Sequence, residues 1–383
     1  MNNSPHVLVD ASAIPANRGG VGRSLEYLVP ALDKLGVRLT VVAQKRDVDW
    51  FAATAPGATV ISPASLPTSR PLRLVWEQLG LPGVARRARA DVIFSPHYTM
   101  PLFAGRPVVV ALYDAIFFSH PELHSRLKGM FFRFWIRRSL KRAAACVAPS
   151  EATKSELLRL VSPGNDKIAV AWLGVDAGTF HVPTKADTAV ATELVGHPKW
   201  IAFLGTLEPR KNVGNLVRAF GALVTQADVR KRYPDLVLAL AGGRGWDTEL
   251  DEIVAASPVR ERILRLGFVP NEALAGLLGG AVATAYPSLG EGFGFPVLEA
   301  MACGSPVLTT RLLSLPEVGG DVAVYADPDA ASIETALAEL LLDDAERKKR
   351  GKAGVERAAK FTWEACAFVH ATVFAEAAGE AAK

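Results

Sequence analysis

The chain has 383 residues, of which half are hydrophobic, and a formal net charge of +4. This length suggests two or three domains with hydrophobic cores of their own. A membrane-spanning helix is excluded because no run of 18 apolar residues occurs. The N-terminal residues lack the layout of a signal peptide. The three cysteines, Cys146, Cys303 and Cys366, are far apart, which predicts no disulfide framework and no metal site and fits a reducing cytoplasm.

Charge is distributed unevenly along the chain. Residues 1–180 carry 22 basic and 13 acidic side chains, whereas the remainder carries 21 basic and 26 acidic ones. A basic first half beside an acidic second half predicts that the first half meets an anionic partner.

The first segment reads as strand, glycine loop, helix and strand. An apolar strand at residues 6–10 is followed by Gly19, Gly20 and Gly22, and then by leucines at helical spacing. A glycine loop at a helix N-terminus is a good place for an anion. The spacing is not that of the dinucleotide-binding fingerprint, and glycines after a first strand can also serve only to turn the chain.

Two later strands, at residues 91–97 and 107–114, end in polar side chains. The first ends at His97 and the second at Tyr113 and Asp114. Because α/β sheets place ligands at the carboxyl ends of their strands, these residues form a candidate crevice. A lone histidine is more often structural than functional. His120 follows closely in the sequence and is a second candidate for the same place.

A strongly basic helix is predicted from Ser125 to Arg142. From 126 to 142 there are seven basic residues and no acidic one, alternating with aromatic and apolar side chains. Such a helix can lie on an anionic membrane surface or be a core helix with a solvated basic face. The cations at such a membrane contact would be Arg133, Arg137, Arg138 and Lys141.

A first domain is predicted over residues 1–176, a polar linker over 177–198 and a second domain over 199–360. The second domain opens with a strand that runs into Gly205 and Thr206. Arg210 and Lys211 follow at the turn into a helix, where two cations can hold a diphosphate. The alternative for this pair is an ordinary surface location.

The organising stretch of the sequence lies between residues 283 and 307. It reads as strand, glycine-rich loop, helix and strand, with Glu291 in the loop and Glu299 in the helix. A loop carboxylate can accept hydrogen bonds from sugar hydroxyls, and one in the helix can reach a ribose diol. The alternative is that Glu299 only complements the helix dipole while Glu291 is a solvated charge.

The spacing Glu291-x7-Glu299, set within about twenty matching residues from Ser288 onwards, closely resembles the donor-site motif of retaining GT-B glycosyltransferases of family 4 (group 1). The resemblance implies two doubly wound Rossmann-like domains facing each other across a cleft. The second domain would bind the nucleotide-sugar and the first the acceptor. In this fold the C-terminal helix, residues 361–383, crosses back to the first domain.

The resemblance also implies roles for individual residues. Glu291, Asp114, Lys211 and Arg210 would be catalytic, while His97 and Tyr113 would lie near the acceptor. At Tyr113 the family usually has a histidine, whose role cannot be transferred to a tyrosine, and Thr206 stands where some members have an arginine. The residues expected at the donor are Gly19, Gly20, Gly22, Gly205, Thr206, Phe268, Val269, Gly292, Phe293, Gly294, Phe295, Leu298 and Glu299.

The function implied is retaining transfer of a sugar to a hydroxyl of a glycan or polyprenyl-linked acceptor. The chain most resembles bacterial mannosyltransferases of O-antigen and exopolysaccharide synthesis, which favours GDP-mannose, with UDP-sugars still open. No Asp-x-Asp is suitably placed, so we expect no metal and no cofactor, and we expect no nucleic acid partner. The location would be cytoplasmic, peripheral to the membrane. Alternatives are a nucleotide-sugar epimerase and a catalytically weakened nucleotide-sugar-binding protein.

Overall fold

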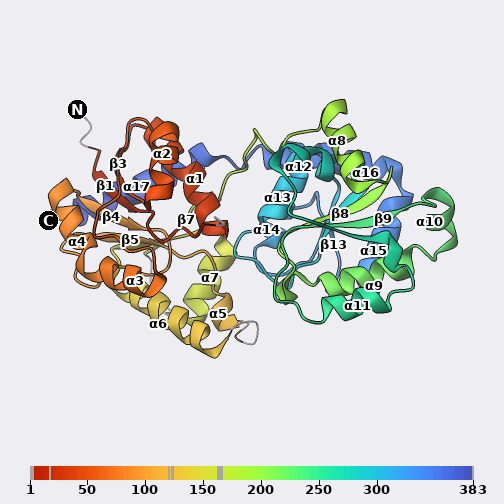
Figure 1. Ribbon diagram of the computed structural model, residues 1–383, viewed down its shortest axis with the longest axis horizontal. Coiled ribbons are helices and arrows are strands. Elements are labelled where there is room, and N and C mark those ends of the chain that lie inside the picture. Colours follow the sequence, from red (N-terminus) through yellow and green to blue (C-terminus); the bar gives the residue numbers. More distant parts are fainter. Residues whose placement is uncertain (1–3, 17–18, 120, 122–124, 162–166, 382–383) are drawn as a thin grey trace. The chain divides into compact units, whose positions relative to one another are not determined.

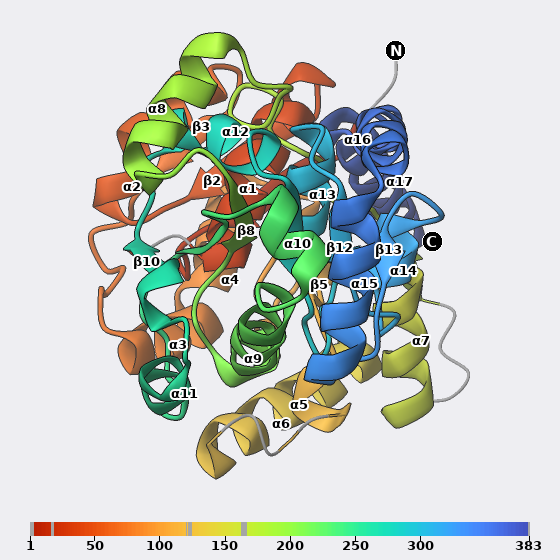
Figure 2. The ribbon, with the colours of Figure 1, turned by 90° about the vertical axis from the view of Figure 1, so that its right-hand side faces the viewer.

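The computed structural model describes residues 4–16, 19–119, 121, 125–161 and 167–381. The chain divides into two compact units: unit 1 is Met1–Gly174 with Phe361–Lys383, and unit 2 is Val175–Lys360. Each unit contains one parallel β-sheet with helices around it (Figures 1 and 2). The prediction of two doubly wound α/β domains is therefore confirmed.

Unit 1 contains a seven-stranded sheet in the order β3-β2-β1-β4-β5-β6-β7. All five residues of β1 are buried, as expected for a parallel strand covered on both faces. The described elements of unit 1 are β1 (His6–Asp10), α1 (Gly19–Lys34), β2 (Arg38–Val42), α2 (Lys45–Thr54), β3 (Thr59–Ile61), α3 (Arg70–Leu79), α4 (Leu81–Ala88), β4 (Val92–Ser95), β5 (Val108–Ala111), α5 (Ile116–Ser119), α6 (Arg126–Arg142), β6 (Ala145–Ala148), α7 (Glu151–Leu160), β7 (Ile168–Val170) and α17 (Trp363–Ala381).

Unit 2 contains a six-stranded sheet in the order β10-β9-β8-β11-β12-β13. Its described elements are α8 (Lys185–Val195), β8 (Trp200–Leu204), η2 (Pro209–Lys211), α9 (Val213–Leu223), α10 (Ala227–Arg232), β9 (Val237–Ala241), α11 (Leu250–Ala256), η3 (Arg260–Arg262), β10 (Ile263–Gly267), α12 (Asn271–Gly279), β11 (Ala283–Tyr286), α13 (Phe295–Ala302), β12 (Val307–Thr309), α14 (Leu315–Gly319), β13 (Val324–Tyr325), α15 (Ala330–Leu342) and α16 (Asp344–Ala358).

The strand order reverses direction once in each sheet. In unit 1 the reversal lies between β1 and β4, and in unit 2 it lies between β8 and β11. The connections on the two sides of such a point diverge to opposite faces, which leaves a crevice at the carboxyl ends of the two strands. These two switch points are where the polar residues of each unit gather.

The C-terminal helix α17 belongs to unit 1. It contacts α1 and strands β4 to β7, and the ring of Trp363 stacks on Tyr27 with centroids 5.4 Å apart. Phe374 packs against Phe94 of the strand beside β1. Among the described residues, no helix combines the length and the apolar character needed to cross a bilayer.

The structure corrects two predictions. The segment 177–198, predicted as an unpatterned linker, contains helix α8, which packs against α12 in unit 2. A capping box formed by Thr184 and Asp187 starts this helix. The loop predicted over Gly19, Gly20 and Gly22 is instead the first turn of α1. The chain enters this helix at Gly19, whose φ of +58° favours glycine. Residues 17–18, which precede it, lie outside the described residues.

Candidate active site

The switch point of unit 2 brings together two segments that are about eighty residues apart in the sequence. β8 leads into the short helix η2, which carries Arg210 and Lys211, and the neighbouring β11 ends at Tyr286 before the glycine-rich loop. The backbone N–H of Leu289 donates to the carbonyl of Arg210 at 2.8 Å. This bond ties the loop to η2, so both cations lie against the start of the loop.

Glu291 lies at the centre of this site and is bound by four side chains. Its Oε2 is 2.5 Å from Arg210 Nη1, and its Oε1 is 2.6 Å from Lys211 Nζ. The hydroxyls of Tyr286 and Ser288 each donate to Oε1 at 2.8 Å. The sequence predicted separate ligand contacts for Glu291 and the cations, whereas here they bind one another.

Electrostatics keep Glu291 ionised. Burial by itself would raise the pKa of this carboxyl, but Lys211 and Arg210 outweigh it and lower the pKa to about 2. Glu208, which the sequence analysis did not select, accepts a hydrogen bond from Arg210 Nη2 at 2.6 Å and lies 3.8 Å from Lys211 Nζ. Two carboxylates therefore balance two cations, and this balance makes the burial of four charged groups tolerable.

The glycine-rich loop is held in one conformation up to the start of α13. Gly294 has φ +109°, a value that favours glycine, and Pro296 occupies the first turn of α13. The hydroxyl of Ser314 lies 2.7 Å from the carbonyl of Glu291 and 2.8 Å from that of Phe293. The N-terminus of α13 thereby follows directly on the Glu291 cluster, and the positive end of a helix is a place where an anion is favoured.

The remaining donor-site candidates of unit 2 differ in exposure. Glu299 and Leu298 on α13 are buried, as is Phe293, while Gly292 and Phe295 are half-buried. Thr206, which follows Gly205 directly after β8, is exposed. After β10, the ring of Phe268 is 84% exposed whereas Val269 is buried. An exposed ring at a strand end is available for stacking, so the base contact remains a prediction for Phe268.

Unit 1 has its own cluster at its switch point, and it was largely missed from the sequence. His97 Nε2 lies 3.1 Å from Oδ2 of Asp10, the last residue of β1. Arg73 of α3 donates to Glu77 at 2.6 Å and lies 3.5 Å from Asp10. Thr99 donates to Glu77 at 2.8 Å. His97, predicted near the acceptor, is thus fixed by a buried polar network.

Three groups of this network, on Asp10, Glu77 and His97, approach one another within 4.8 Å, as metal ligands would. The guanidinium of Arg73 bonds to Glu77, and it contacts both Asp10 and His97 Nε2. A cation of the protein's own therefore occupies the position that would attract a metal ion. Asp10 stays ionised because His97 and Arg73 overcome the effect of burial and lower its pKa to about 2.

The strand next to β4 carries the other two candidates of unit 1. Tyr113 and Asp114 follow β5 and are half-buried, and the ring of Tyr113 lies 6.3 Å from that of Tyr98. Burial, with a smaller effect of Cys366, raises the pKa of Tyr113, so this side chain can hydrogen-bond but carries no charge near neutral pH. His120 lies outside the described residues.

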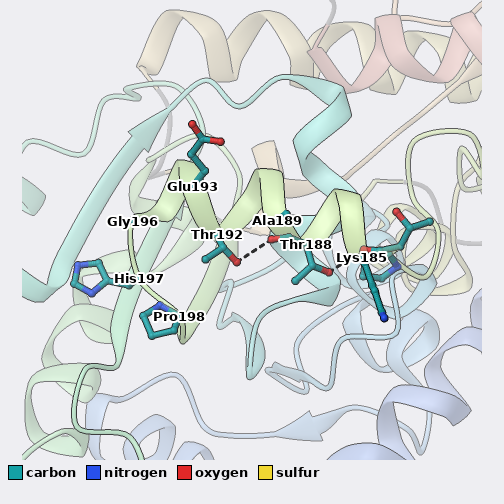
Figure 3. Close-up of a pocket in the computed structure, with 10 residues that line it drawn as sticks. Lys185, Thr188, Ala189, Thr192, Glu193, Gly196, His197 and Pro198 are labelled. Atoms are coloured by element: carbon teal, nitrogen blue, oxygen red, sulfur yellow. Dashed lines mark hydrogen bonds between the residues drawn. The ribbon is translucent and has the colours of Figure 1, made fainter.

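A surface hollow of unit 2 lies away from the Glu291 cluster. This hollow, of about 810 Å³, lies beside α8 and is lined by residues between Pro183 and Pro198 (Figure 3). The hydroxyls of Thr188 and Thr192 donate to carbonyls of their own helix. Because these hydroxyls are used within the helix and are not presented to a ligand, we do not assign this hollow to the active site.

The residues missed in unit 2 had weak signals in the sequence. Glu208 is an acidic residue two positions before Arg210, and Tyr286 and Ser288 are polar residues at the end of an apolar strand. Acidic residues beside two cations could have suggested an ion-paired cluster. The cluster of unit 1 had a weaker signal, because Asp10, Arg73 and His97 are far apart in the chain and only the fold joins them.

Two doubly wound parallel sheets with polar clusters at their switch points define the GT-B class of glycosyltransferase folds. The model for "glycosyl transferases group 1" matches residues 185–357, and the model for "glycosyltransferase family 4" matches residues 18–178. O-antigen chain mannosyltransferase B of Escherichia coli is 33% identical over 286 residues, which cover 74% of each chain. The chain belongs to the group 1, family 4 glycosyltransferases and is a hexosyltransferase.

Solved structures agree on the fold. Sucrose-phosphate synthase of Thermosynechococcus elongatus superimposes with a TM-score of 0.79 at 19% identity, covering 99% of this chain and 100% of that one. HepE of Anabaena, in complex with UDP-glucose, gives a TM-score of 0.72 at 17% identity, with 99% of both chains covered. The predicted GT-B fold, family and enzyme class are confirmed.

Proposed function

We propose that this enzyme transfers mannose from GDP-mannose to a hydroxyl of a glycan or polyprenyl-linked acceptor, with retention, in bacterial polysaccharide synthesis. The observation that carries the proposal is the contact of Glu291 with both Arg210 and Lys211 at the switch point of unit 2. The mannosyltransferase of E. coli supports the choice of sugar. The complex of HepE with UDP-glucose supports a nucleotide-sugar as the donor.

In this proposal the diphosphate of the donor replaces Glu291 as the partner of the cations. Arg210 and Lys211 both contact Glu291, and Arg210 also contacts Glu208, so the two cations are held at one carboxylate whose place a diphosphate could take. Arg210 offers a planar fork and Lys211 a point charge. Glu291, released from the cations, would accept hydrogen bonds from the hydroxyls of the sugar, and Glu299 would bind the ribose.

The chemical step needs charge stabilisation on the leaving diphosphate. The two cations and the N–H groups at the start of α13 would supply it without a metal ion. The acceptor hydroxyl would attack from the face that the diphosphate leaves, and a phosphate oxygen would take its proton. Such a step needs no ionised base at Tyr113, whose pKa is raised by burial; Asp114 would orient the acceptor.

A membrane surface is part of the proposal because a polyprenyl-linked acceptor resides there. Helix α6 keeps the cations predicted for this contact, with Arg137, Arg138 and Lys141 exposed and Arg133 half-buried. Each cation near an anionic bilayer favours binding by about 1 kcal/mol. The enzyme would then be peripheral to the membrane.

Transfer assays with labelled GDP-mannose and with UDP-hexoses test the donor. We expect product from GDP-mannose with the α-configuration retained, unchanged turnover in EDTA, and loss of product in Glu291→Ala. The matched control is Glu272→Ala, which removes an exposed carboxylate of α12 in the same unit and should leave turnover unchanged. Product from UDP-hexoses alone would refute the mannosyl assignment, an inverted anomer would refute retention, and release of an epimerised sugar would favour the epimerase.

A further inference from the structure

Helix α6 exposes apolar as well as basic side chains. Leu127, Met130 and Phe134, at positions i, i+3 and i+7, form one stripe along the helix. Between 48 and 80% of each of these residues is exposed. In a solvated basic face this stripe would have no role, because large apolar groups on a water-facing helix gain nothing from hydration.

Helix α3 repeats the same pattern. Leu72, Val75 and Leu79 also lie at i, i+3 and i+7, and between 54 and 78% of each is exposed. The other side of α3 is anchored in unit 1 through buried Trp76 and Glu77. An apolar stripe on a helix usually faces the protein core, so its exposure indicates a partner outside the described residues of the chain.

The segment 100–103 connects the two helices. On one side, the amide of Gln78 in α3 donates to the carbonyl of Met100 at 3.0 Å and accepts from the N–H of Leu102 at 2.9 Å. On the other side, Arg142 at the end of α6 donates to the carbonyl of Leu102 and lies over the ring of Phe103. That ring is 84% exposed.

The charges around this surface, the α3–α6 face (residues 70–79, 100–103 and 126–142), are of one sign. Helix α6 has no acidic residue, and the carboxylate of α3, Glu77, is buried and paired with Arg73. Met130 and Phe134 share a surface groove with the cations Arg133, Arg137, Arg138 and Lys141. Exposed apolar side chains interspersed with cations match a bilayer that presents acyl chains beneath anionic headgroups.

We propose that the α3–α6 face inserts its apolar side chains into an anionic bilayer, with α3 and Phe103 forming a second point of insertion beside α6. This extends the membrane contact proposed above for α6 and rests on it. A second copy of the chain is a poorer occupant of the face, since a two-fold contact would bring the same cations together. The bilayer satisfies both the apolar stripes and the charge.

Vesicle flotation tests the insertion of α3. Full-length protein would be mixed with phosphatidylcholine vesicles, with and without phosphatidylglycerol. The variant Leu72→Ser/Val75→Ser/Leu79→Ser should bind the anionic vesicles about tenfold or more weakly. Its matched control, Val190→Ser/Leu194→Ser, changes exposed apolar residues of α8 in unit 2 and should bind as the unchanged protein does. Unchanged binding by the α3 variant would overturn the proposal.

A second measurement leaves the α3 stripe almost intact. An environment-sensitive dye would be attached to the new cysteine of the Leu79→Cys variant. The three native cysteines are buried and should remain unlabelled. We expect a blue shift only with anionic vesicles; no shift would overturn the insertion. Light scattering tests the competing occupant: a dimer that the α3 triple variant converts to a monomer would make this face a self-interface and refute the proposal.

The same preparations separate this inference from the proposed reaction. Binding of GDP-mannose should be unaffected in the α3 variant, because Arg210 and Lys211, which would hold its diphosphate, lie in unit 2. If vesicle binding behaves as expected while GDP-mannose neither binds nor reacts, the reaction is wrong but the insertion of α3 stands. If GDP-mannose reacts but no vesicle binds, the membrane contact of both α6 and α3 is wrong.

Discussion

The two units place similar sets of charged groups at equivalent points of their sheets. At the switch point of unit 2, Glu208 and Glu291 contact Arg210 and Lys211. At that of unit 1, two carboxylates contact one arginine and one histidine, and these residues are Asp10, Glu77, Arg73 and His97. Charge composition therefore does not distinguish a ligand site from a structural cluster.

Accessibility distinguishes the two clusters. In unit 1 the carboxylate side chains are 0% exposed, since Arg73 reaches over them from α3. In unit 2 the carboxylates keep 9–10% of their side-chain surface exposed and Arg210 keeps 18%. An accessible ion pair can exchange one partner for a ligand, whereas a sealed one mainly fixes the elements around it. We therefore assign phosphate binding to unit 2 and anchoring of α3 to unit 1.

The largest effect should follow from removing Lys211. In Lys211→Ala, Glu291 loses one of its two cations, and the leaving diphosphate would lose a point charge. We expect turnover to fall about 10³-fold, a loss typical of removing one group that stabilises a developing oxyanion. Labelled transfer and calorimetry with GDP measure it. Lys231→Ala, at an exposed lysine of α10, is the control, and unchanged GDP affinity in Lys211→Ala would contradict the phosphate assignment.

Arg73→Met should separate stability from catalysis. The substitution leaves Glu77 and Asp10 buried with less compensation, so we expect a loss of about 3–5 kcal/mol in the free energy of unfolding. Thermal and denaturant unfolding measure it, with GDP binding by unit 2 unchanged. The double variant Arg73→Met/Glu77→Leu, which removes the charged pair, should recover much of the loss. If Arg73→Met instead kept full stability but lost transfer, the cluster of unit 1 would be functional and the contrast between the units would fail.

Most of the fold could be predicted because its signals are local. Apolar runs such as residues 6–10 form buried parallel strands, and helix α6 begins after Ser125, whose side chain accepts a hydrogen bond from Lys128 N–H. α8 was missed because most of its apolar side chains face away from a core, with only Ala191 and Val195 buried. Its capping residues, Thr184 and Asp187, were the available signal.

The candidate site could be predicted only in part, because its pairings depend on the sheet. Glu291 and the two cations were selected from the sequence, but their mutual contact depends on β8 lying beside β11. The same holds for His97 and Asp10, which meet because β1 pairs with β4. A sequence places residues at strand ends, whereas the strand order decides which ends are neighbours.

Acid should destabilise unit 1 at a milder pH than unit 2. Burial lowers the pKa of His370, on α17, from 6.5 to about 4, so the unfolded chain takes up a proton that the folded chain excludes. The free energy of unfolding is therefore at its full value above pH 6.5. It decreases by about 3 kcal/mol as the pH falls towards 4. Calorimetry between pH 7 and 4 should show the loss, and His370→Phe should remove most of it; burial also lowers the pKa of His6, which accounts for the remainder.

In unit 2, the stability contributed by the ionised carboxylate of Glu291 is lost only at a lower pH. Because the pKa of Glu291 falls from 4.5 to about 2 on folding, its contribution is present above pH 4.5 and disappears as the pH falls towards 2. If the His370→Phe protein lost as much stability between pH 6.5 and 4 as the unchanged protein, a group other than His370 would be responsible for the loss.

The smallest effects come from single hydroxyls that donate to the two central carboxylates. Thr99→Val removes the donor to Glu77, and Ser288→Ala removes a donor to Glu291; both bonds are 2.8 Å long. Each change should cost about 1 kcal/mol in the free energy of unfolding, since one buried hydrogen bond is lost while the charged partners remain. Only Ser288→Ala should also change the KM for the donor, because only Glu291 would exchange its partners when the diphosphate binds. Equal changes of KM in both variants would mean that the sealed cluster of unit 1 also takes part in donor binding. Accessibility would then not be the property that distinguishes the cluster of unit 1 from that of unit 2.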